Sequence, residues 1–117
     1  MSDKIKTGTE GEDLAAAYLE QKGFVVLERN YRYKRSEIDL IVRRGNWLVF
    51  VEVKTRTSDA YGFPEEFVDY KKKKKIFEGA DYYMFYTNWP GNVRYDIVAI
   101  SMGTGSPQVH HLEDAFY

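Results

Sequence analysis

The sequence predicts an α/β domain in which helices flank a mixed central β-sheet. Two stretches space their apolar residues as helices do, and several shorter runs have the alternating or continuous apolar pattern of strands. These segments follow one another in the order α-β-β-β-α-β, with a short candidate strand at the end. A chain of 117 residues without repeats or low-complexity segments fits one domain.

The first helix is predicted over residues 9–23, and residues 1–8 are expected to form a loose start. The apolar stripe of this helix consists of Leu14, Ala15, Tyr18 and Leu19. Gly23 is well placed to end the helix, because glycine readily adopts the left-handed conformation of a C-terminal cap.

The second helix is predicted over residues 64–86. Pro64 suits a first helical turn, and the two acids after it complement the positive end of the helix dipole. Gly79 weakens such a helix by roughly 1 kcal/mol relative to alanine. Three aromatic residues are spaced for packing and are expected mainly in the core, namely Tyr82, Tyr83 and Tyr86. A turn cluster follows at residues 88–92.

Five strands are predicted around these helices, at residues 24–29, 37–42, 47–55, 93–100 and 109–112. The second and third should form a hairpin around a two-residue Gly-Asn turn, in which aliphatic residues face one another next to the turn. A three-residue loop would instead set Asp39 against Val53 and mix charge into an apolar face. The hydrophobic pattern therefore favours the two-residue turn.

This register gathers ionisable groups on one side of the hairpin, with Asp39 opposite Glu52 and Glu37 opposite Lys54. Two facing carboxylates with β-carbons about 5 Å apart repel each other, and a divalent cation would offset that repulsion. Carboxylate oxygens are hard ligands that suit Mg²⁺ or Mn²⁺. Lys54 could hold a water molecule or stabilise charge on a phosphate. The alternative is a solvated polar stripe with a weak Glu37–Lys54 ion pair.

Composition narrows the classes of function. Lys and Arg (17) nearly balance Asp and Glu (18), so binding to nucleic acid would need a local basic patch. The chain has no cysteine, which excludes thiolate metal sites and cysteine nucleophiles. No secretory signal and no membrane-spanning apolar run is visible, so a cytoplasmic protein without a membrane partner is expected.

These motifs together resemble the bacterial UPF0102 family, the YraN-like proteins. The match rests on EIDLI at 37–41 and FVEVK at 50–54, with Gly8, Gly11, Glu12, Gly23, Arg29, Asn30, Arg56, Lys72, Ala80, Tyr95 and Asp96 in the same order. Ser36 stands where that family usually has glycine.

The resemblance implies a restriction-endonuclease-like fold, similar to PD-(D/E)xK nucleases and archaeal Holliday-junction resolvases. It further implies that Asp39 and Glu52 bind metal and that Lys54 is the catalytic lysine. Glu12 matches an acid in the first helix of the resolvases, which implies that it assists. Its alternative role is to complement the helix dipole.

Basic residues near the hairpin are candidates for binding nucleic acid. The run at 71–75 covers every side of a helix, and Lys72 and Lys73 point nearest to the predicted buried stripe, so these two could contact phosphate. The resemblance favours Lys72, which matches the family position. Arg32 and Arg56 flank the hairpin and, with nearby tyrosines, could line a groove for the backbone. A solvated, merely solubilising set of charges is the alternative.

Two features outside the hairpin carry less chemistry. Asp96 is expected to support the sheet or a neighbouring basic residue rather than to act in catalysis. His110 and His111 are adjacent on a predicted strand and so face opposite ways, which argues against a joint metal site.

The sequence thus predicts an Mg²⁺- or Mn²⁺-dependent endonuclease that hydrolyses phosphodiester bonds in DNA, branched or structured DNA included. A symmetric homodimer is the simple geometry if both strands are cut. Two rival functions stay open. One is a nucleic-acid-binding module that keeps the nuclease fold without turnover, and the other is a protein-interaction domain.

Overall fold

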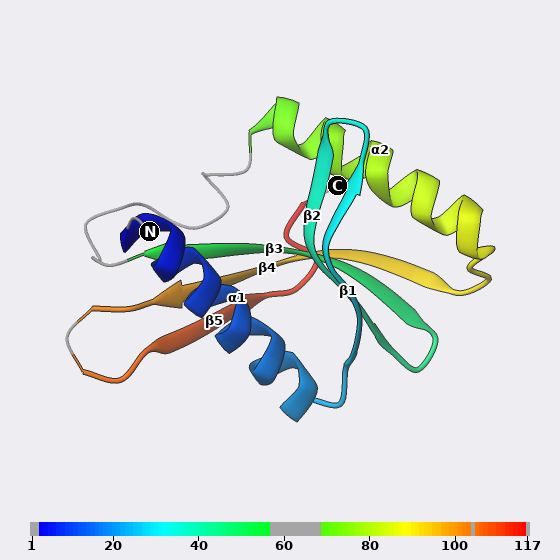
Figure 1. Cartoon of the computed structure of the whole chain (residues 1–117). Coiled ribbons are helices and arrows are strands. Elements are labelled where there is room, and N and C mark those ends of the chain that lie inside the picture. The colour runs from blue at the N-terminus through cyan, green and yellow to red at the C-terminus, as the bar shows by residue number, and fades with distance from the viewer. Residues whose placement is uncertain (1–2, 57–68, 104, 117) are drawn as a thin grey trace.

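The computed structural model describes residues 3–56, 69–103 and 105–116, and it confirms the predicted α/β class (Figure 1). Its elements are α1 (Asp3–Gln21), β1 (Val25–Tyr33), β2 (Ser36–Arg44), β3 (Trp47–Arg56), α2 (Tyr70–Thr87), β4 (Asn92–Ser101) and β5 (Gln108–Leu112). Neither of these helices is apolar enough over a sufficient length to cross a membrane.

The five strands form one mixed sheet in the order β1-β2-β3-β4-β5. The central pair, β3 and β4, is parallel, and all the other neighbouring pairs are antiparallel (Figure 1). A parallel pair needs a crossover connection, and α2 lies in the segment of chain that joins β3 to β4. The mixed sheet and the order of its elements therefore agree with the prediction.

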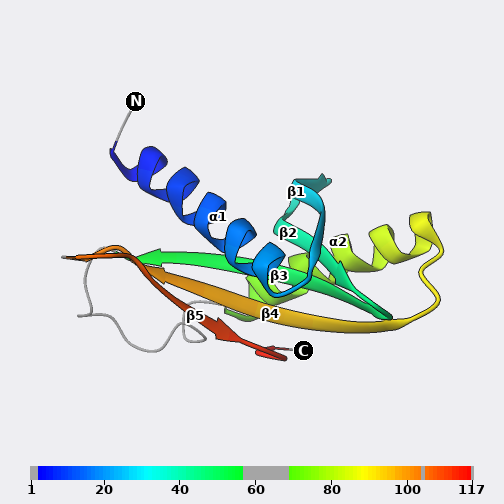
Figure 2. The same ribbon diagram turned by 90° about the horizontal axis from the view of Figure 1, so that it is seen from below.

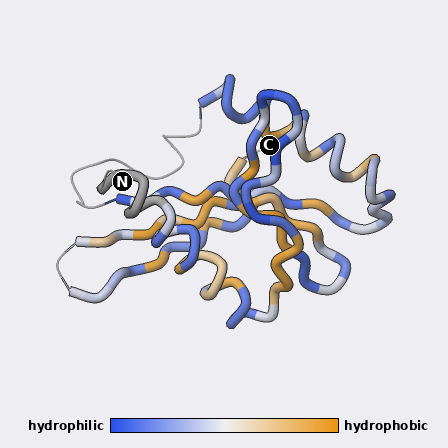
Figure 3. The backbone as a smooth tube through the Cα atoms, viewed as in Figure 1, coloured by the Kyte–Doolittle hydropathy of each residue, from blue (hydrophilic) through white to orange (hydrophobic). Residues whose placement is uncertain are grey.

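The helices cover opposite faces of the sheet, as the alternation of β3 requires. Val49 and Val51 pack with the apolar side of α1, whereas Leu48 and Phe50 pack with Ile76 and its neighbours on α2. Figure 2 shows α1 lying along its face, and Figure 3 shows hydrophobic residues concentrated in the central strands. Near the β2–β3 turn, the side chains on both faces of β3 are therefore buried.

The structure corrects the N-terminal boundaries. Helix α1 begins at Asp3 instead of residue 9, so residues 3–8 are helical and not a loose start. It ends close to Gly23, whose φ of +93° fits the predicted stop. Strand β1 continues to Tyr33 through a register shift between Val26 and Glu28 and a left-handed residue, Asn30. Because of these irregularities, the second half of the strand does not show the regular apolar pattern by which strands are predicted from sequence.

Helix α2 begins at Tyr70, where the Asp69 carboxylate caps it by accepting a hydrogen bond from the Lys72 N–H at 2.9 Å. The predicted start at residue 64 lies outside the described residues. Gly79 is buried, and a β-carbon there would meet the Ser36 Cβ at 3.3 Å. The glycine that lowers helix propensity therefore allows α2 to approach β2 closely.

The predicted burial of the three tyrosines on α2 is wrong for two of them. Tyr83 is buried in the core, but Tyr82 is 38% exposed and Tyr86 is 74% exposed. Strand β5 confirms the candidate strand at the end of the chain.

Candidate active site

The predicted β2–β3 register is confirmed next to the turn, from Arg44↔Trp47 to Leu40↔Val51. Beyond Leu40 the two strands no longer form ladder pairs. The side chain of Asp39 takes the place of the ladder there, because its Oδ2 accepts a hydrogen bond from the Val53 N–H at 2.8 Å. Asp39 is thus fixed against β3 by one oxygen.

The predicted Glu37–Lys54 pairing is wrong. Glu37 pairs across the β1–β2 ladder with Arg32, and the Arg32 Nη2 lies 3.6 Å from the Glu37 Oε2. Beyond Leu40, β2 follows β1 instead of β3, so its outer end is carried away from Lys54. Both side chains of the Arg32–Glu37 pair are largely solvent-accessible, and such a pair stabilises little.

Glu52 is the most enclosed acid of the site, with a side chain only 3% exposed. Its Oε1 lies 2.7 Å from the Lys72 Nζ of α2 and 3.7 Å from the Lys54 Nζ of the same strand. Its Oε2 is buried and has no hydrogen-bonding partner among the described residues. A buried carboxylate oxygen without a partner is costly, so this atom is the first candidate to contact a cation.

The carboxyl group of Asp39 senses this neighbourhood. Burial first, and then the negative charge of Glu52, raise its pKa from 3.8 to about 7. The Val53 N–H and the ammonium group of Lys72 act in the opposite direction but do not prevail. Asp39 resists ionisation beside the buried carboxyl group of Glu52, and a divalent cation would balance the negative charge of such a site.

The two lysines have different electrostatic environments. Burial, followed by the charge of Lys72 and Arg56, lowers the pKa of Lys54 even though Glu52 and Asp39 oppose it. For Lys72, burial alone would lower the pKa, but the hydrogen bond and charge of Glu52 raise it. Lys72 therefore holds its proton as the partner of Glu52, whereas Lys54 is the more ready of the two to release one.

Glu12 lies on α1 and influences the site electrostatically. Its negative charge is the smallest of the named contributions that raise the pKa of Asp39, and the role predicted for Glu12 stays a prediction. The neighbouring Gly11 is buried, and a β-carbon there would lie 3.1 Å from the Thr55 Cβ. Glycine at this position lets α1 approach the end of β3 closely.

The donor set fits a hard cation with few protein ligands. Within the described ranges, no three His, Cys, Asp or Glu side chains are grouped so that they could hold one ion. The carboxylates of Asp39 and Glu52 remain as oxygen donors, and Mg²⁺ commonly takes one or two carboxylates and keeps several waters. The free Oε2 of Glu52 is the observation of this structure that matches such an ion.

The three residues predicted to contact nucleic acid lie in different surroundings. Lys72 lies inside the site on Glu52, and its side chain is still 45% exposed. Arg56 ends β3, and its Nη1 donates to the Thr55 carbonyl at 3.0 Å. Arg32 lies on β1, 76% exposed, beside Glu37. The Lys72–Glu52 contact was not predicted, although the orientation of Lys72 towards the buried stripe was a signal for it.

A second buried cluster lies on β4 and β5, and of its members the sequence pointed only to Asp96. Asp96 accepts two hydrogen bonds from Arg94, at 2.8 and 2.9 Å, and one from the Asp114 N–H at 2.9 Å. Its Oδ2 also lies 2.7 Å from the Nε2 of His111. Burial would raise the pKa of Asp96, but these bonds lower it. The cluster ties the C-terminal segment to the sheet, as expected of a supporting acid.

The comparisons with known proteins agree with one another. A model of the family described as "Uncharacterised protein family UPF0102" matches residues 11–100. A UPF0102 protein of Cytophaga hutchinsonii is 46% identical over 112 residues, which cover 96% of each chain. One of Rhodococcus opacus is 42% identical over 118 residues, covering 99% of this chain and all of the relative. One of Anaeromyxobacter dehalogenans is 46% identical over 110 residues, covering 93% of this chain and 82% of the relative.

Proposed function

The chain belongs to the uncharacterised protein family UPF0102, and from the geometry of its site we propose that it is a metal-dependent nuclease. Its reaction would be the hydrolysis of phosphodiester bonds in DNA, with branched or structured DNA among the substrates to test. The cofactor would be Mg²⁺ or Mn²⁺, held by Asp39 and Glu52.

One observation carries this proposal. The Oε2 of Glu52 is buried without a hydrogen-bonding partner among the described residues, beside an acid whose pKa is raised to about 7. A structure that needed only a surface ion pair would not bury one carboxylate and set a second, half-buried one beside it. A cation between them accounts for both features at once.

Each side chain then has a distinct task. Asp39 is oriented by the Val53 N–H, so its second oxygen is the one available to an ion. Lys72 holds the Oε1 of Glu52 and fixes the direction of that carboxylate. Lys54, from the same strand, would position the attacking water and stabilise charge on the phosphate. When bound, the divalent ion supplies Lewis-acid polarisation of the phosphoryl oxygen.

Glu12 would act at longer range. Its charge reaches Asp39, but it belongs to no three-ligand group within the described ranges. Its role would be to accept a hydrogen bond from a water molecule near the ion. Glu12→Gln should therefore slow cleavage less than Asp39→Asn does.

The test is a cleavage assay on linear duplex, single-stranded and four-way DNA with Mg²⁺ or Mn²⁺. Wild-type protein should cut at least one substrate, and a chelator should stop the reaction. Asp39→Asn and Glu52→Gln should lose activity, whereas Glu37→Gln is the matched control because Glu37 pairs with Arg32 outside the site. If the wild type binds metal normally but cuts none of these substrates, the proposed nuclease activity is refuted.

One observation favours the rival, a nucleic-acid-binding module without turnover. The ion pair of Lys72 with Glu52 already compensates that carboxylate without any metal. This reading predicts DNA binding that weakens steeply with salt and no saturable binding of divalent ions. A metal titration before the cleavage assay separates the two functions.

A further inference from the structure

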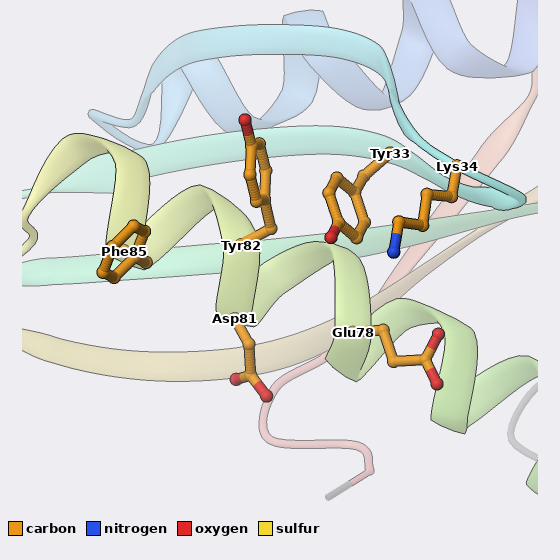
Figure 4. A pocket seen from close by; sticks show the side chains of 6 residues that line it. All are labelled: Tyr33, Lys34, Glu78, Asp81, Tyr82 and Phe85. Carbon is orange, nitrogen blue, oxygen red and sulfur yellow. The ribbon is translucent and has the colours of Figure 1, made fainter.

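A row of tyrosine rings lies on the surface between α2 and the end of β1. The Tyr33 and Tyr82 rings stack with centroids 4.1 Å apart and planes 21° apart, and Tyr82 and Tyr86 stack at 6.1 Å with the same tilt. Figure 4 shows Tyr33 and Tyr82 beside each other. The row ends at Tyr86, which is 74% exposed, so most of its ring is accessible.

These rings contribute little to the core. Tyr83, the next residue along the helix, packs inside, whereas Tyr82 and Tyr86 belong to neither buried cluster. An open pocket of about 510 Å³ adjoins the row and is lined by Tyr33, Lys34, Glu78, Asp81, Tyr82 and Phe85 (Figure 4). Parallel rings held against one another on the surface are pre-ordered to accept a further flat ring.

Basic side chains extend the row towards the proposed active site. Lys71, Lys75, Tyr82 and Tyr86 follow at intervals of four, seven and four residues, so they lie along one side of α2. At 1.5 Å per residue this side spans about 22 Å, enough for roughly six stacked nucleotides. Lys71 at its far end adjoins Lys72, the partner of Glu52.

Cationic side chains lie on both sides of the stacked rings. The Lys34 Nζ lies 5.3 Å from the centre of the Tyr33 ring, and Lys71 and Lys75 precede Tyr82 along α2. Figure 4 shows the Asp81 carboxylate directed away from the Tyr82 ring, whereas Glu78, three residues after Lys75 and four before Tyr82, shares their side of the helix. Phosphates are therefore expected at the lysines, and the uncharged bases at the rings.

We propose that this row, Tyr33–Tyr82–Tyr86 with Lys71 and Lys75, binds an unpaired strand of nucleic acid. Bases stack on the ring at the Tyr86 end, and phosphates lie along the two lysines. The inference rests on the proposed nuclease function for the identity of the ligand, and it names the substrate class: DNA with a single-stranded segment beside the cleavage point.

A second copy of the chain fits this surface less well. A stable interface buries about 800 Å² on each partner and has an apolar centre. Here the exposed rings form a narrow row, with charged Lys34, Glu78 and Asp81 beside it. Base stacking needs only the faces of the rings and tolerates charged borders.

The experiment measures affinity for an oligothymidylate of about 12 nucleotides by fluorescence anisotropy, with a chelator present so that nothing is cut. Tyr82→Ala and Tyr86→Ala should each weaken binding by about tenfold or more. Tyr70→Ala is the matched control, because Tyr70 is a 78% exposed ring on α2 that belongs neither to the row nor to the pocket lining, and the affinity of this variant should stay within about twofold of wild type.

Further variants separate stacking from loss of structure. Tyr86→Phe keeps the ring and should bind as the wild type does. Lys75→Ala should lower both the affinity and its salt dependence, whereas Lys74→Ala, on another side of the helix, should change them less. Circular dichroism should show unchanged helix content, since alanine is favourable at exposed helical positions.

Each outcome decides the question. Unchanged oligothymidylate binding by Tyr82→Ala and Tyr86→Ala overturns the inference, and so does an equal loss with Tyr70→Ala. A wild type that sediments as a dimer, and becomes monomeric in those variants at unchanged affinity, assigns the row to self-association. If the tyrosine variants lose binding but the wild type cuts no DNA, the proposed nuclease activity is overturned and the stacking surface stands. If the wild type cuts DNA but the tyrosine variants bind as it does, only the stacking surface is overturned.

Discussion

Replacing Asp39 with asparagine should stabilise the metal-free protein at neutral and alkaline pH, although it removes a proposed catalytic group. Burial and the charge of Glu52 raise the pKa of Asp39 from 3.8 to about 7. Asparagine has nearly the same shape, and its carbonyl oxygen can still accept the hydrogen bond from the Val53 N–H. The substitution thus removes the charge and keeps the geometry.

The sign follows from which state holds the proton. Between the unfolded pKa of 3.8 and the folded pKa of about 7, the folded protein keeps the Asp39 proton and the unfolded chain has lost it. The free energy of unfolding therefore falls as pH rises through this window and levels off above it. A shift of about three pKa units corresponds to a loss of up to about 4 kcal/mol, which the asparagine variant escapes.

The assay is urea unfolding of both proteins with a chelator present, at several pH values from about 4.5 to about 8.5. The two stabilities should be similar at the acidic end. At the alkaline end the variant should be more stable by at least about 1 kcal/mol, which raises Tm by roughly 4 °C. A variant that is less stable at alkaline pH, or a difference that does not change with pH, would refute the account of Asp39.

Three further substitutions test separate parts of the structure. Lys54→Ala should slow cleavage by about 100-fold or more while metal affinity changes little, and loss of metal binding in a titration would contradict its assigned role. Asp96→Ala should cost about 3 kcal/mol in urea unfolding, because the charge of Arg94 loses a fully buried partner; a stability within about 0.5 kcal/mol of wild type would contradict this. Gly11→Ala should lower the free energy of unfolding by roughly 1–3 kcal/mol by crowding Thr55, and Thr55→Ala should restore part of it; no change in urea would contradict the close approach.

The hairpin could be predicted because its information is local. A two-residue turn and the alternation of apolar residues set the register from Arg44↔Trp47 to Leu40↔Val51, and the structure has that register. The same pattern identified the order of strands and helices, since each period reflects one buried face. Asp39, Glu52 and Lys54 were found because they interrupt that apolar pattern.

Longer-range features could not be predicted in the same way. The departure of β2 from β3 beyond Leu40 depends on its pairing with β1, whose register shift and left-handed Asn30 leave no regular pattern. The contact of Lys72 with Glu52 depends on how closely α2 approaches the sheet. That approach is set by Gly79, which sequence propensity alone treats only as a weakness of the helix.

The proposed function depends on a divalent cation that Asp39 and Glu52 share. Titration with Mn²⁺, followed by electron paramagnetic resonance at about pH 8 so that Asp39 is ionised, measures this without any substrate. The wild type should bind one ion that Mg²⁺ displaces, Glu52→Gln should lose that site, and Glu37→Gln should keep it. Absence of saturable binding by the wild type, or equal affinity in Glu52→Gln, would contradict the claim.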